Sequence, residues 1–82
     1  MTARETQIAK RILDFLHAED GRQVHAMTIH CEIGGLNLCS SQEFEGVLAE
    51  LNTRKFVVGV TTKFRGMVFN ISDAGEAARL EM

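Results

Sequence analysis

Apolar residues near the N-terminus recur at helical spacing. They fall on one stripe of a helix: Ile8, Ile12, Phe15 and Leu16. Ahead of them, Thr2 and Glu5 have the spacing of a capping box, in which each residue binds the backbone of the other. We therefore expect a helix from Ala3 to Ala18, ended by a turn in which Gly21 takes a left-handed conformation.

A second helical pattern lies in the middle of the chain. Its apolar positions follow the i, i+3, i+4, i+7 rule: Phe44, Val47, Leu48 and Leu51. Ser40 and Glu43 repeat the capping-box spacing, which predicts a helix that begins after Ser40 and ends near Asn52 to Arg54.

The stretch between these two helices has a weaker pattern. Val24 can begin a short extended piece, and a helix of about two turns should then end at Gly34 and Gly35. The residues expected to face inward from it are Met27, Cys31 or His30, and Ile33.

The C-terminal third changes to an alternating pattern, which is typical of β-strands. Two such runs flank a polar turn and predict an antiparallel hairpin over Lys55 to Ile71. Asp73 and Glu76 then have a third capping-box spacing, so a short helix of about two turns should finish the chain.

Composition limits the classes that the chain can belong to. Its 82 residues, 45% of them hydrophobic, suit one small domain that spans residues 1–82. No apolar run approaches the roughly 20 residues of a membrane span, and charges throughout the first 20 residues are unlike a signal peptide. We therefore expect no membrane partner, a cytoplasmic location and two reduced cysteines.

Two segments carry a resemblance to a known family. The stretch "SSQEFEGVLAELNTRKFVVGV" resembles the third helix of the winged helix-turn-helix superfamily as it runs into the first wing strand. The stretch "FNISDAGEAAR" is similar to the exit from the second wing strand into a helix in many bacterial members. The resemblance implies an α+β fold with a three-helix core, a two-stranded β-hairpin wing and a short last helix. It also implies that the third helix enters the major groove of DNA while the hairpin touches the backbone or minor groove.

The charges in these segments point in two directions. The outward line of the third helix is Gln42, Gly46, Ala49 and Thr53, with three glutamates beside it, and a net charge of −2 gives no general attraction to DNA. Residues 54 to 65, in contrast, hold one basic cluster without any acidic residue: Arg54, Lys55, Lys63 and Arg65.

Two functions therefore stay open. The first is a DNA-binding transcriptional regulator that acts as a homodimer on double-stranded DNA. Its expected DNA-binding residues are Ser41, Gln42, Glu45, Ala49, Thr53, Arg54, Lys55, Lys63, Phe64 and Arg65. The second is a winged helix module that binds a protein partner without binding DNA, which explains the glutamates better but not the basic wing.

Catalysis and metal binding find little support in the chain. Four residues have the chemistry of zinc ligands but not a compact ligand spacing: His25, His30, Cys31 and Cys39. We expect both cysteines to be small buried groups instead. Without a phosphate-binding glycine loop or a nucleophile motif, we expect no enzyme activity, no metal and no cofactor.

Overall fold

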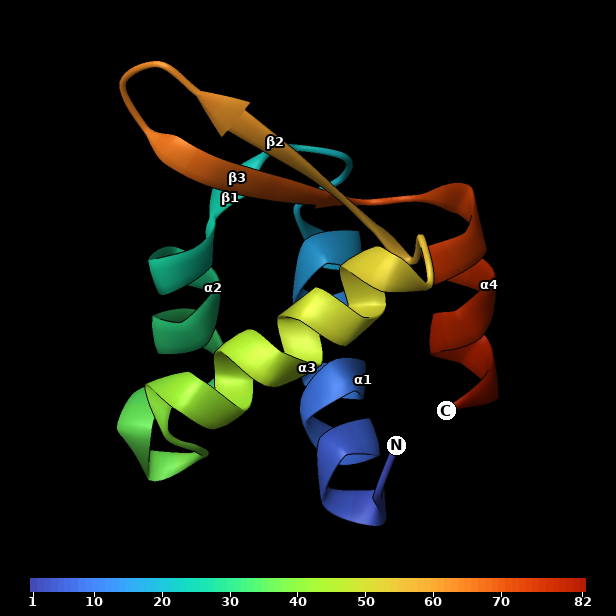
Figure 1. Cartoon of the computed structure of the whole chain (residues 1–82). Helices are drawn as coiled ribbons and strands as arrows, with labels where there is room; N and C mark the ends of the chain where they lie inside the picture. Colours follow the sequence, from blue (N-terminus) through green and yellow to red (C-terminus); the bar gives the residue numbers. More distant parts are fainter.

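The chain folds as an α+β structure in which three helices precede a β-hairpin and a fourth helix follows it (Figure 1). The computed structural model describes all residues from Met1 to Met82. In chain order the elements are α1 (Ala3–Ala18), β1 (Val24–His25), α2 (Ala26–Ile33), the short 3-10 helix η1 (Gly35–Asn37), α3 (Ser41–Thr53), β2 (Val57–Thr62), β3 (Gly66–Ile71) and α4 (Asp73–Glu81).

The sheet has three antiparallel strands in the order β1-β3-β2, and it lies across one end of the helices (Figure 1). The hairpin was expected, with Val57 opposite Ile71 and Thr62 opposite Gly66. The third strand was not: the extended piece at Val24 pairs with Phe69 of β3. This pairing ties the start of α2 to the hairpin and leaves β2 as an edge strand.

Hydroxyl side chains begin three of the helices. The expected capping box at α1 is complete, since the Glu5 backbone N donates to Thr2 Oγ1 at 3.1 Å and the Thr2 backbone N donates to Glu5 Oε1 at 2.9 Å. At α4 the expected cap was wrong by one residue. Ser72 is extended and accepts from the Gly75 backbone N at 3.0 Å, whereas Asp73 is already helical.

The core lies between α1, α2, α3 and the sheet, and its members confirm the two strong helical patterns. The inward positions expected for α2 were partly wrong. Met27 is 72% exposed and Cys31 is exposed, while Ile29, His30 and Ile33 are buried. Since this eight-residue helix is apolar on several sides, its sequence pattern did not define one inward face.

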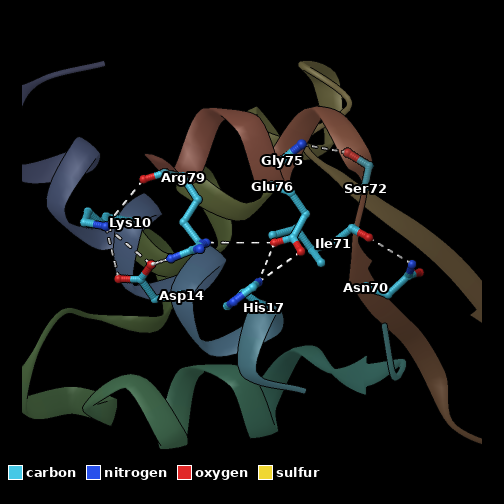
Figure 2. Close-up of polar contacts among 9 residues, drawn as sticks. All are labelled: Lys10, Asp14, His17, Asn70, Ile71, Ser72, Gly75, Glu76 and Arg79. Atoms are coloured by element: carbon cyan, nitrogen blue, oxygen red, sulfur yellow. Dashed lines mark hydrogen bonds and ion pairs between the residues drawn. The ribbon is translucent and has the colours of Figure 1, made fainter. Parts of the chain in front are cut away.

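Helix α4 packs beside α1 and is joined to it by charged side chains (Figure 2). Arg79 Nη1 donates to Asp14 Oδ1 at 3.2 Å, and His17 Nδ1 lies 2.8 Å from Glu76 Oε1. Gly75 is buried in the first turn, where an added Cβ would fall on the carbonyl oxygen of Phe56. The base of the hairpin is thus held tightly between α3 and α4.

Candidate nucleic-acid interface

The exposed side of α3 carries the side chains that the sequence assigned to base contacts. They are all exposed: Ser41, Gln42, Glu45, Ala49 and Thr53. Four of them follow each other at intervals of three or four residues, which places them along one stripe of the helix. This stripe is therefore available to a partner, and its chemistry is polar and mostly uncharged.

Two of the three glutamates on α3 are engaged within the chain. Arg4 of α1 binds Glu43 through two hydrogen bonds, from Nε to Oε2 at 2.7 Å and from Nη2 to Oε1 at 3.0 Å. Through these bonds Arg4 holds the pKa of Glu43 below its usual value, so the carboxylate stays ionised and paired. Arg54 binds Glu50 one turn away at 2.8 Å. Glu45 alone among the three forms no ion pair.

The basic residues expected to form one cluster lie in two separate pairs. Arg54 and Lys55 stand at the base of the hairpin, and Lys63 and Arg65 stand at its tip. Strand β2 separates the pairs, and a strand of six residues spans about 20 Å. Arg54 is in addition bound to Glu50. The four cations therefore do not form one free patch on the surface, and their contact with phosphates stays a prediction.

The hairpin tip exposes an aromatic ring between two cations. Phe64 is 90% exposed, and Lys63 Nζ lies 5.6 Å from the centre of its ring. The turn is closed by Thr62, whose Oγ1 accepts from the Arg65 backbone N at 3.0 Å. Neither cation forms an ion pair. The tip therefore presents two cations without an acidic partner and an exposed aromatic ring on which a partner can stack.

A groove separates α3 from the inner face of the hairpin. It has a volume of about 330 Å³, and the residues that line it are Ala26, Glu45, Leu48, Ala49, Asn52, Met67 and Phe69. Most of these side chains are apolar. Sequence reasoning missed the groove. Its signal in the sequence was Gly59, in the middle of β2. A Cβ at this position would lie 2.7 Å from Cε2 of Phe69, so a larger residue would displace this ring, which lines the groove.

Gly46, on the exposed side of α3, has no packing reason to be glycine. A Cβ built there meets no atom within 4 Å, and the residue is exposed. The lack of a side chain at this exposed position leaves room for another backbone to approach α3 closely.

The histidines and cysteines that resembled zinc ligands have other contacts. His30 stacks on Phe44 with 4.6 Å between ring centres, and its Nε2 lies 3.0 Å from the carbonyl oxygen of Cys39. His25 caps α2 by accepting from the Met27 backbone N. The expectation of buried cysteines held for Cys39 only, and nowhere do three His, Cys, Asp or Glu side chains gather as metal ligands would.

Comparisons with family models, with curated proteins and with solved structures found no match to this chain. None of the helices is both long enough and apolar enough to cross a membrane. The assignment of a function therefore depends on the geometry of α3 and the hairpin.

Proposed function

We propose that this chain is a winged helix protein that binds duplex DNA in the cytoplasm and regulates transcription. In this proposal α3 enters the major groove, and the β2–β3 hairpin is the wing. The order of three helices, a hairpin and a short pairing strand before α2 supports the winged helix assignment. An architecture of this kind does not define a function, so the function depends on the side chains that α3 and the hairpin expose.

The proposal depends on which charged side chains form ion pairs within the chain and which do not. Glu43 and Glu50 are paired with arginines, so their repulsion of phosphates is reduced, while Lys63 and Arg65 have no acidic partner. Phosphate contacts supply most of the affinity in DNA binding, and two free cations at the tip suit that role.

The stripe on α3 would then read the bases. Gln42 is the side chain best suited to this task, since a glutamine amide donates to and accepts from adenine. Glu45 suits a cytosine amino group, and Ala49 leaves room for a thymine methyl. Thr53 and Ser41 lie at the two ends of the stripe, where a hydroxyl reaches a base or a phosphate.

A second candidate function is favoured by the groove between α3 and the hairpin. Its lining is mostly apolar and includes Met67, which is 43% exposed. Such a surface suits a protein or peptide partner better than it suits phosphates. In this alternative, Glu45 at the rim would meet a basic residue of the partner.

A titration of labelled, mixed-sequence duplex DNA by fluorescence anisotropy tests the first function. We expect binding that weakens with salt, with a slope of log K against log salt of about −2 if only Lys63 and Arg65 meet phosphates. Contacts by all four wing cations would make the slope about −3 to −4. A lack of binding at low salt would contradict the proposal and favour the protein-binding alternative.

A further inference from the structure

Strand β2 forms an open edge of the sheet and lacks the features that usually protect such an edge. Its sequence VVGVTT contains no charged residue and no proline. Natural edge strands carry lysine, proline or a bulge because an open edge pairs readily with another strand. The other edge, β1, is only two residues long, so β2 is the one long edge of this sheet.

Two valines on β2 are exposed on the same face of the strand. Val58 is 44% exposed and Val60 is 39% exposed. Residues two apart on a strand point to one face, so both lie on the side opposite to Val57, which is buried in the core. Both valines therefore keep apolar side-chain surface that is exposed to solvent.

We propose that β2 pairs with β2 of a second copy of this chain, antiparallel and centred on Gly59. A twofold axis perpendicular to the sheet then places Gly59 opposite its own copy. Val58 stands opposite Val60 of the second copy, and Val60 stands opposite its Val58. Directly opposite side chains in an antiparallel pair share a face, so the four valines form one apolar patch across the axis.

A second copy is the occupant that this edge fits best, because the strand is complementary to itself. In the register centred on Gly59, each exposed valine meets a valine. A register centred on Val60 would instead place Val58 against Thr62. The interface is isologous and closes after two copies, since each chain uses its only long edge. The resulting sheet has the order β1-β3-β2-β2-β3-β1, with both α3 helices on the same side.

The ends of the paired strands carry like charges. In the proposed register, Lys63 of each copy lies level with Lys55 of the other, just outside β2. Salt screens this repulsion, so pairing should not weaken as salt rises. DNA binding has the opposite dependence on salt. The pairing therefore does not rest on the proposed function and is measured without DNA.

Sedimentation velocity of the full chain, from micromolar to near-millimolar concentration, tests the pairing. We expect a monomer–dimer equilibrium for the natural sequence and monomers at all concentrations for Val58→Lys and for Val60→Lys. Leu80→Lys is the matched control, since Leu80 is 75% exposed on α4 and the same charge is added away from β2. Circular dichroism would verify that each variant is folded.

Three results would overturn the proposal: a natural sequence that stays monomeric, a dimer that tolerates both lysine variants, or a dimer that the Leu80→Lys control also loses. Growth beyond the dimer would contradict it as well, because a closed twofold pair leaves no long edge free.

Disulfide trapping tests the register independently of affinity. The variants Val58→Cys and Val60→Cys are made separately with Cys31→Ser, which removes the exposed natural thiol. We expect a mixture of the two to form a cross-linked dimer. In this register the two cysteines stand directly opposite each other, with Cβ atoms about 4.5–5.5 Å apart, and a small shift of the strands brings them within the range of a disulfide. Each variant alone should stay largely uncross-linked. Efficient cross-linking of Val60→Cys with itself would show a different register and contradict this one.

Discussion

The two ends of the β2–β3 hairpin are held in different ways. At the base, Val57 and Ile71 are buried, and the Ser72 hydroxyl donates to the carbonyl oxygen of Lys55 at 2.6 Å. At the tip, Phe64 is 90% exposed, and the hydrogen bonds around it are local to the turn. The base is therefore held by burial in the core and by a hydrogen bond from Ser72, whereas the tip is held by hydrogen bonds within its own turn.

This difference indicates which residues serve the fold and which serve a partner. Substitutions at the base remove buried contacts, so they should reduce the free energy of unfolding. Substitutions at the tip remove no such contact, so their effect should be on binding.

The largest effect is expected at Gly75. In Gly75→Ala, the new Cβ collides with the backbone of Phe56, which cannot move away as a flexible side chain would. We expect a loss of about 3 kcal/mol or more in the free energy of unfolding, measured by urea denaturation. Gly46→Ala is the control, since a Cβ there meets nothing and alanine favours helix. Equal losses in both variants would contradict this account of the base.

A smaller effect is expected from the two neighbouring valines of β2. Val57 is 1% exposed and Val58 is 44% exposed. Val57→Ala should cost about 2 kcal/mol, through lost burial and a cavity, and Val58→Ala less than about 0.5 kcal/mol. Urea denaturation at low protein concentration measures both on monomers. A larger cost for Val58→Ala would mean that the faces of β2 are assigned wrongly.

Loss of the Ser72 hydroxyl should reduce the free energy of unfolding by less than Val57→Ala does. Its hydroxyl accepts from the Gly75 backbone N (Figure 2). It also donates to the carbonyl oxygen of Lys55, so it links the hairpin base to α4. We expect Ser72→Ala to cost about 1 kcal/mol and Ser72→Thr, which keeps the hydroxyl, to cost less. Thermal unfolding compares the two. If they are equally destabilised, the hydroxyl does not stabilise the base.

At the tip, Phe64→Ala should change stability by less than about 0.5 kcal/mol because the ring is almost fully exposed. Affinity for duplex DNA should fall several-fold if the ring stacks or packs against the nucleic acid. Thermal unfolding and an anisotropy titration on the same sample separate these effects. A strongly destabilised variant would show that the ring belongs to the fold.

The sequence predicted the fold best where local signals agreed with each other. The capping residues Thr2 and Ser40 precede clear apolar periodicities, and α1 and α3 formed as expected. At α4, Ser72 and Asp73 are both good N-cap residues in adjacent positions, and spacing alone did not choose between them. Strand β1 has only two residues, which is too short for an alternating pattern to predict its partner.

The candidate site was harder to predict because charges that are close in sequence are not close in space. Lys55 and Lys63 flank a whole strand and therefore lie at opposite ends of the hairpin. The pairing of Glu43 with Arg4 joins residues 39 positions apart. A contact between residues so far apart in the chain leaves no pattern in the sequence. The negative charge of Glu43 on α3 was therefore counted without the arginine that pairs with it.

The central claim is that the free cations at the hairpin tip bind DNA. A DNA titration of Lys63→Glu beside Arg11→Glu tests it most directly, since both variants change the net charge by the same amount and Arg11 lies on α1. The account predicts that Lys63→Glu loses most of the affinity of the natural sequence while Arg11→Glu keeps most of it, with both folded. Equal affinities for the two variants, or no DNA binding by the natural sequence at low salt, would contradict it.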